Sequence, residues 1–348
     1  MHSRWSGSFQ VAAVYVGTIV GAGFATGKEI FEFFTRYGFY GFIGILIAGY
    51  IFIFTGTKIM LLSLRAGAAT YEDFNSYLFG TKIAPVVNVI FLFMLLGVTS
   101  VMISGAGAVF QEQLGLSKHI GVAATILLTV IVLLLGVKGL FAVNSFVVPL
   151  MILFSLMLCF LSIKGGGLID SFLRVPEGGG TWKSWLSPFA YTAFNLGLAQ
   201  AVLVPVSKEI GDEQTIKRGG LLGGTFLTVI LLSGHFALIS LQDASIYEIP
   251  TAELMKNGAA NLYWIFILVI YGEIFSSVIG NIFGLQRQIS STFRRVPDII
   301  ILFAILFITY MISRVGYGRL LGLLYPAFGY ISILFLILVW KEKTNKRT

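Results

Sequence analysis

The sequence has few of the residues on which enzymes and disulfide-stabilised proteins depend. Its 348 residues include a single cysteine, Cys159, so an intramolecular disulfide is excluded. The three histidines, His2, His119 and His235, are far apart in the chain and form no metal-ligand motif with that cysteine. The sequence contains no P-loop and no nucleophile elbow. We therefore expect neither an enzyme, nor a cofactor-dependent protein, nor an ATP-driven pump.

Charge is also scarce, because only 11% of the residues are charged and 57% are hydrophobic. Apolar runs of about 20 residues, the length that spans a bilayer, recur from one end of the chain to the other. The sequence therefore predicts an all-α polytopic protein whose main partner is the lipid bilayer. In such a protein the net charge of +8 indicates basic cytoplasmic loops rather than nucleic-acid binding.

Ten apolar segments are expected to cross the membrane, at 8–35, 42–64, 83–110, 120–137, 141–163, 185–206, 219–241, 259–285, 298–312 and 320–340. Short extra helices are expected near residues 71–74 and after Ile249-Pro250. Residues 1–348 then form one transmembrane domain, with a glycine-rich linker at 164–183. Five spans precede the linker and five follow it, so repeat one (8–163) and repeat two (184–340) enter the membrane from opposite faces, as an inverted repeat does.

An even number of spans places both termini on the same side of the membrane. If that side is cytoplasmic, its loops and tail hold the larger share of the lysines and arginines, including Arg65, Lys217 and Arg218. The positive-inside rule favours this orientation. We therefore expect a multi-pass protein of the bacterial cell membrane with cytoplasmic N- and C-termini.

A glycine cluster, Gly17-Thr18-Ile19-Val20-Gly21-Ala22-Gly23, lies in the middle of the first span. Each glycine is about 1 kcal/mol less favourable than alanine in a helix. The cluster indicates either close packing of a neighbouring helix or a break that exposes main-chain groups to a ligand. Asn195-Leu196-Gly197 interrupts the first span of the second half in the same way. Paired breaks favour a substrate site near the middle of the bilayer.

These two segments resemble those of a known family. Residues 17–23 look like the unwound first helix of LeuT-fold transporters in the amino acid–polyamine–organocation superfamily, and Phe194-Asn195-Leu196-Gly197 looks like the matching part of their sixth helix. As a whole the chain resembles the bacterial YkvI-type membrane proteins. The resemblance implies a LeuT-like fold in which helices 1 and 6 are both discontinuous. It also implies a small-molecule substrate, either an amino acid or a related amine or zwitterion.

The resemblance further implies where that substrate binds. Main-chain amides of Ala22 and Gly23 would hold its carboxylate, which the N-terminus of a half-helix also favours on general grounds. Groups of the sixth span would hold the amine, Phe24 and Phe194 would act as thin gates, and serines of the third span would replace the aromatic hydroxyl of some relatives. The predicted substrate-binding residues are Ala22, Gly23, Phe24, Ser100, Ser104, Thr192, Ala193, Phe194, Asn195 and Gly197.

The polar residues of the spans are consistent with either of two coupling ions, Na⁺ or H⁺. Sodium-coupled relatives imply a cation held by the carbonyls of Gly17 and Val20 and the hydroxyls of Ser276 and Ser277, an all-oxygen set suited to Na⁺. The absence of a basic residue in the fifth span also favours Na⁺. Glu273, one turn before these serines, is expected to be a proton acceptor, a cation ligand or a contact for a positively charged substrate, or else a neutral acid bonded to another helix.

Lys28 and Glu29 follow the first break, and Glu29 is expected to pair with a basic residue as an outer gate. The sequence thus favours a Na⁺-coupled symporter, with proton coupling through Glu273 as the alternative. A second class is a ligand-sensing membrane protein that keeps this fold without transport. Substrate identity and oligomeric state remain open.

Overall fold

The computed structural model of the chain describes residues 2–134, 137–164, 180–241, 244–293 and 295–342, and most of the predicted linker 164–183 lies outside them. The longer helices are α1 (His2–Ile19), α4 (Phe39–Ile51), α7 (Ala84–Ala108), α8 (Lys118–Leu134), α9 (Val137–Lys164), α11 (Trp182–Ile210), α12 (Glu213–Ile239), α14 (Tyr263–Thr292), α15 (Asp298–Ser313) and α16 (Tyr317–Lys341). The shorter ones are α2 (Ala22–Ala25), α3 (Lys28–Phe33), α5 (Thr57–Arg65), α6 (Tyr71–Phe79) and α13 (Pro250–Gly258), with 3₁₀ turns η1 (Thr35–Tyr37), η4 (Ala244–Ile246) and η5 (Ala260–Leu262) and π-helical turns η2 (Phe52–Gly56) and η3 (Val109–Gln113).

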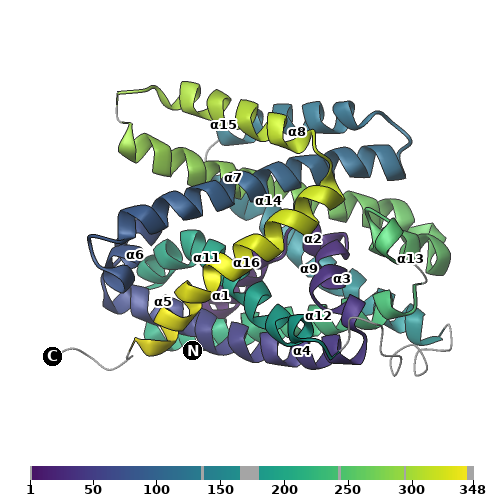
Figure 1. Cartoon of the computed structure of the whole chain (residues 1–348), viewed down its shortest axis with the longest axis horizontal. Helices are drawn as coiled ribbons and strands as arrows, with labels where there is room; N and C mark the ends of the chain where they lie inside the picture. Colours follow the sequence, from purple (N-terminus) through teal and green to yellow (C-terminus); the bar gives the residue numbers. More distant parts are fainter. Residues whose placement is uncertain (1, 135–136, 165–179, 242–243, 294, 343–348) are drawn as a thin grey trace.

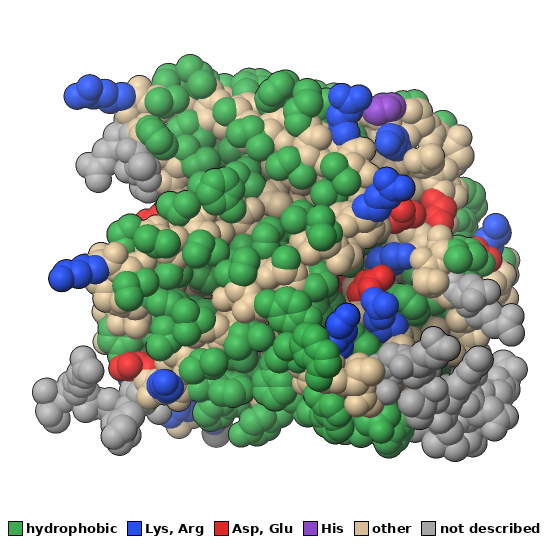
Figure 2. Space-filling model, viewed as in Figure 1, with side chains coloured by type: hydrophobic (Ala, Val, Ile, Leu, Met, Phe, Trp, Pro, Cys, Tyr) green, Lys and Arg blue, Asp and Glu red, His purple; other side chains and the backbone are tan. Residues whose placement is uncertain are grey.

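Six helical segments of the described part are long and apolar enough to cross a membrane: 39–65, 84–113, 182–210, 213–239, 260–290 and 317–341. Four shorter apolar helices, 7–19, 118–133, 149–163 and 298–313, lie in the remaining predicted spans. Hydrophobic side chains cover the middle of the visible face, and charged side chains gather toward its left and right edges (Figure 2). The chain is therefore a helical membrane protein, and the count of ten spans stays a prediction.

The two short loop helices lie where the sequence predicted them, and their start residues explain why. The Thr70 hydroxyl accepts a hydrogen bond from the Asp73 N–H at 3.2 Å, while the Asp73 carboxylate accepts one from the Thr70 N–H at 3.0 Å. This reciprocal capping box satisfies amides that α6 would otherwise leave unpaired. α13 begins with Pro250, which needs no N–H partner at a helix start.

A stripe of four glycines on α12 holds the two halves of the molecule together. Gly219 and Gly223 lie against Val11 and Tyr15 of α1, and Gly220 and Gly224 lie against Thr57 and Ile53 of the α4–η2–α5 segment. The absence of side chains on this stripe brings the helix backbones close, as in other membrane helix pairs.

The start of α1 and the end of α16 lie on the same side of the protein. Gly7 contacts Thr215 near the start of α12, and α12 is linked to α5 by the ion pair Arg65–Glu213 at 2.8 Å. α5 in turn reaches α16, because the Lys58 ammonium donates to the Trp340 carbonyl at 2.9 Å. The start of α1 and the end of α16 accordingly lie toward the left of the view, and α13 lies at the right (Figure 1).

The broken first helix lies inside the bundle. α8 and α15 form an outer layer that packs on α7 and α14, as the upper part of Figure 1 shows. α7 and α14 in turn contact α2, the short segment in the middle of the broken helix. The break is therefore surrounded by protein.

Candidate functional site

The first helix is discontinuous at the glycine cluster, as predicted. α1 ends at Ile19, Gly21 is extended (φ −125°, ψ −167°), and a single turn, α2, begins at Ala22. Among the described residues, no backbone hydrogen bond satisfies the N–H groups of Gly21 and Gly23 or the carbonyls of residues 17–20. Six main-chain groups are thus left without a backbone partner, and the residues from Ile19 to Gly23 are buried.

Helices α7 and α14 meet at this break. The Ala22 N–H donates to the thioether sulfur of Met102 at 3.2 Å, which is a weak acceptor. A Cβ atom added to Gly21 would lie 2.8 Å from the Met102 methyl group and 3.4 Å from the Ser277 hydroxyl. Sequence reasoning did not select Met102, because nothing distinguishes this residue from the other apolar side chains of its helix.

Of the α14 residues predicted to bind the cation, Ser277 lies next to the break. Ser277 touches Gly21, the neighbour of Val20, whereas Gly17 lies about one helical turn earlier. Ser276 is buried beside Ser277, and Glu273 precedes Ser277 by one turn. Glu273 is fully buried, and neither carboxylate oxygen makes a hydrogen bond with the described residues. The structure thus places the Ser277 hydroxyl beside Gly21, while the roles of Gly17, Val20, Glu273, Ser276 and Ser277 as ion ligands remain predictions.

The sixth predicted span is not broken, and that expectation was wrong. α11 runs as one helix from Trp182 to Ile210, through Asn195-Leu196-Gly197. Gly197 has a packing role instead, because a Cβ there would lie 2.9 Å from the Phe91 ring and 3.4 Å from the Ser332 hydroxyl. Any contribution of α11 to binding therefore comes from side chains rather than from freed main-chain groups.

The remaining predicted residues of α11 are buried but differ in position. The Thr192 hydroxyl donates back to the Pro188 carbonyl at 2.7 Å, so it serves its own helix. The Asn195 amide nitrogen donates to the Tyr191 carbonyl at 3.0 Å and reaches the Glu29 carboxylate at 3.4 Å. The Phe194 ring packs at a tilt against Tyr325 of α16 with ring centroids 4.6 Å apart, and Ala193 and Phe24 are also buried.

By helical geometry Ser100 and Ser104 lie on the side of α7 opposite Met102, and their substrate-binding role stays a prediction. At about 100° per residue, both stand roughly 160° around α7 from Met102, which faces the break. The Ser100 hydroxyl donates to the Leu96 carbonyl of its own helix at 2.7 Å. The residue of α7 that approaches α2 besides Met102 is Gly105, which lies against Ala22 and Tyr317.

A second interruption separates α2 from α3. Gly27 adopts a left-handed conformation (φ 78°) that favours glycine. Thr251, at the start of α13, donates through its hydroxyl to the Ala25 carbonyl at 2.9 Å and through its N–H to the Thr26 carbonyl at 3.2 Å. These bonds satisfy carbonyls that the end of α2 leaves unpaired, so α13 closes this interruption and leaves the first one open.

The expected outer-gate ion pair is absent from the described residues. The Lys28 ammonium donates to the carbonyls of Ser245 at 2.8 Å and Tyr247 at 2.7 Å, and so fixes the connection between α12 and α13. Glu29 is 2% exposed and points into the protein, where Asn195 and not a basic side chain approaches it. The gating roles of Lys28 and Glu29 stay predictions, but their geometry differs from a paired gate.

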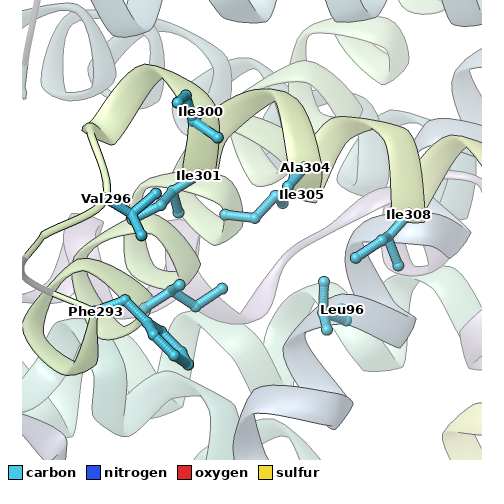
Figure 3. Close-up of a pocket in the computed structure, with 9 residues that line it drawn as sticks. Leu96, Phe293, Val296, Ile300, Ile301, Ala304, Ile305 and Ile308 are labelled. Atoms are coloured by element: carbon cyan, nitrogen blue, oxygen red, sulfur yellow. The ribbon is translucent and has the colours of Figure 1, made fainter.

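An apolar cavity of about 200 Å³ lies away from these groups, between α14, α15 and one side of α7 (Figure 3). Its lining is Leu96, Ile289, Phe293, Val296, Ile300, Ile301, Ala304, Ile305 and Ile308. Because no polar side chain lines it, it cannot orient a polar solute, and we place the candidate site at the break instead.

Comparison with solved structures identifies the architecture. A substrate-bound, outward-open Na⁺-coupled sialic acid symporter matches with a TM-score of 0.66, covering 94% of this chain and 76% of its own, at 12% identity. The nucleobase-cation-symport-1 family transporter Mhp1, closed with bromovinylhydantoin bound, matches with a TM-score of 0.65, covering 91% and 74%, at 11% identity. At these identities the matches show the fold alone. The protein is a LeuT-fold membrane protein, which confirms the expected fold.

Sequence comparison shows the family. The chain is 46% identical over 345 residues to the uncharacterized membrane protein YkvI of Bacillus subtilis (strain 168), covering 97% of this chain and 96% of that protein. It belongs to the family of YkvI membrane proteins. No family model matches the sequence.

Proposed function

We propose that this protein is a secondary transporter that moves a small amino acid or related amine by alternating access, coupled to Na⁺. The observation that supports the proposal is the open break in helix 1. Main-chain groups without partners are tolerated at membrane depth only where a cavity, a ligand or other protein groups replace them. A polar solute held at residues 17–23 would supply those partners.

The coupling ion is assigned to the oxygen atoms on the α14 side of the break. The carbonyls of Gly17 and Val20 and the hydroxyls of Ser276 and Ser277 are the ligand types that hard cations prefer. The contact between Ser277 and Gly21 supports this assignment. An ion bound there would tie α14 to the break and so favour one arrangement of helix 1, which couples ion binding to substrate affinity.

Proton coupling is the alternative, and Glu273 supports it. Its carboxyl group is fully buried and makes no hydrogen bond with the described residues. A carboxyl group at membrane depth is expensive to ionise without a partner, so gain and loss of a proton would accompany any change in its surroundings. The two ions predict different responses to imposed gradients.

Uptake into proteoliposomes tests the proposal, with a panel of amino acids and amines and with Na⁺ and pH gradients imposed separately. We expect uptake to follow the Na⁺ gradient and Ser277→Ala to remove that dependence. Ser290→Ala is the matched control, because Ser290 lies on the same helix but bonds Asp298 at 2.6 Å. If Ser277→Ala keeps full Na⁺ dependence, the cation site is wrong.

Two further outcomes decide between the alternatives. Uptake driven by the pH gradient, and lost in Glu273→Gln, would assign the coupling to protons. Substrate-dependent thermal stabilisation of the purified protein without uptake under either gradient would indicate a ligand sensor and contradict transport.

A further inference from the structure

A second group of polar side chains lies next to the break, on the side of α3, α11 and α16. We call Glu29, Tyr191, Asn195 and Tyr325 the Glu29 cluster. Glu29 comes from α3, Tyr191 and Asn195 are one turn apart on α11, and Tyr325 lies on α16. The four side chains are between 0% and 7% exposed, so they face the interior of the bundle.

The Glu29 carboxylate fills the space beside the freed main chain. A Cβ atom added to Gly23 would lie 2.6 Å from one carboxylate oxygen and 3.1 Å from the Glu29 Cβ. The other oxygen lies 3.4 Å from the Asn195 amide nitrogen. An acidic side chain thus stands where the family resemblance places the carboxylate of a substrate. Two carboxylates brought together in a buried site repel each other, which opposes that mode of binding.

Two buried phenol groups, those of Tyr191 and Tyr325, lie in the neighbourhood of this carboxylate. Tyr191 and Tyr325 are both 0% exposed, and their hydroxyl oxygens make no hydrogen bond of good geometry with the described residues. Both phenols interact electrostatically with Glu29, and Tyr191 lies closer to its carboxylate than Tyr325 does. Phe194 covers the Tyr325 ring. Oxygen acceptors and aromatic rings around one acidic group are the surroundings that bind an ammonium ion well.

The protein supplies no cation for Glu29 among its described residues. The neighbouring Lys28 is bonded to two carbonyls of the α12–α13 connection, and the ion pairs of the described part leave Glu29 out. A buried carboxylate without a counter-ion is strongly unfavourable, so Glu29 either holds a proton or, once ionised, pairs with a cation from outside the chain.

We infer that the Glu29 cluster binds the ammonium group of the substrate, and that the substrate is an amine of net positive charge rather than a zwitterion. The Glu29 carboxylate neutralises the ammonium ion and Tyr191, Tyr325 and Asn195 surround it. This inference rests on the proposed function for the idea that the break holds a solute, and it adds the charge of that solute.

The test compares each amino acid with the amine formed by its decarboxylation, for example phenylalanine with phenethylamine and leucine with isoamylamine. Ligand-induced thermal shifts and calorimetric titration of the purified full-length protein measure affinity without requiring transport. We expect an amine to bind more tightly than its amino acid by roughly tenfold or more, because only the amino acid brings a second carboxylate to Glu29. If the wild-type protein binds the amino acids as tightly as the amines or more tightly, that result by itself overturns the inference.

Variants then locate the effect. Glu29→Gln should lower amine affinity by roughly tenfold or more and abolish the preference over amino acids, whereas Glu29→Asp should keep the preference. Glu32→Gln is the matched control, because Glu32 lies on the same helix but pairs with Arg36 at 2.6 Å near the surface. Unchanged amine affinity in a folded Glu29→Gln protein would overturn the assignment of Glu29.

The same assays separate this inference from the proposed function. Tight amine binding without uptake in proteoliposomes would contradict transport and leave the ammonium site standing. Uptake of amino acids without any preference for amines would contradict the ammonium site and leave transport standing.

Discussion

Glu273 and Glu29 are both buried acids near the broken helix, yet their surroundings differ. Glu29 has an amide and two phenols around it, whereas the oxygens of Glu273 make no hydrogen bond with the described residues. We therefore assign Glu29 to the substrate and keep Glu273 for the coupling ion. The assignments predict different consequences when each charge is removed.

Replacing Glu273 with glutamine is expected to leave the thermal stability in Na⁺-free buffer unchanged or raised. The carboxyl group has no partner to lose, and the amide avoids the penalty for burying a charge. Thermal unfolding of the detergent-purified protein measures this, with Glu253→Gln on α13 as a control. A drop of several degrees in Glu273→Gln alone would show that Glu273 serves as a structural bonding partner instead.

Replacing Lys28 with alanine is expected to loosen the connection between α12 and α13. The Lys28 ammonium holds the carbonyls of Ser245 and Tyr247, and alanine leaves both without that donor. In a Cys159→Ser background, a cysteine at Tyr247 should react faster with a maleimide after Lys28→Ala.

Lys256→Ala is the control for this change, because Lys256 is an exposed residue of α13. Equal labelling rates in the two alanine variants would contradict a role for Lys28 in holding this connection.

At the scale of elements, the packing of α1 on α12 depends on glycines that sequence reasoning left aside. A Cβ atom at Gly223 would lie 2.6 Å from the Tyr15 ring, and the Tyr15 hydroxyl donates to the Phe52 carbonyl at 2.7 Å. Tyr15 is thus held by its hydrogen bond and cannot move away from an added methyl group without losing it.

Gly223→Ala is therefore expected to destabilise the protein by about 1–3 kcal/mol, the usual range for overpacking a core. Gly322→Ala on α16 is the matched control, since nothing lies within 4 Å of the added Cβ, and it should be neutral or slightly stabilising. Thermal unfolding in detergent compares the two variants. Equal stability would mean that α1 and α12 are not in close contact in solution.

The elements also show why one predicted break formed and the other did not. Three glycines within seven residues weaken the first helix wherever it lies in the structure. Gly197 is alone, and a single glycine is equally compatible with a break and with a neighbour that packs closely. Phe91 occupies that position in the folded protein, and the residue belongs to a distant part of the chain.

At the scale of the whole molecule, the orientation in the membrane gives the last prediction. α6 lies on the side of both chain ends, because the Tyr77 hydroxyl donates to Glu342 at 2.8 Å, and α13 lies on the opposite side (Figure 1). The greater number of basic residues favours a cytoplasmic location for the first side.

Single cysteines in a Cys159→Ser background test this arrangement in intact cells. A membrane-impermeant maleimide should label Lys256→Cys on α13 and spare Glu72→Cys on α6, with both labelled in opened membranes. Labelling of Glu72→Cys alone would indicate the opposite orientation. Labelling of both cysteines in intact cells would contradict the placement of α6 and α13 on opposite sides of the membrane.

The sequence by itself determined the membrane environment, the positions of the helices and the break in helix 1, because apolar length and glycine content act locally along the chain. Only the tertiary structure decided which side chains surround that break. Ser100 and Ser104 face away from it while Met102 faces it, and Glu29 meets Tyr191 and Tyr325 rather than a basic residue. These contacts depend on how each helix is rotated against neighbours that are distant in the chain, and the packing of the complete bundle sets that rotation.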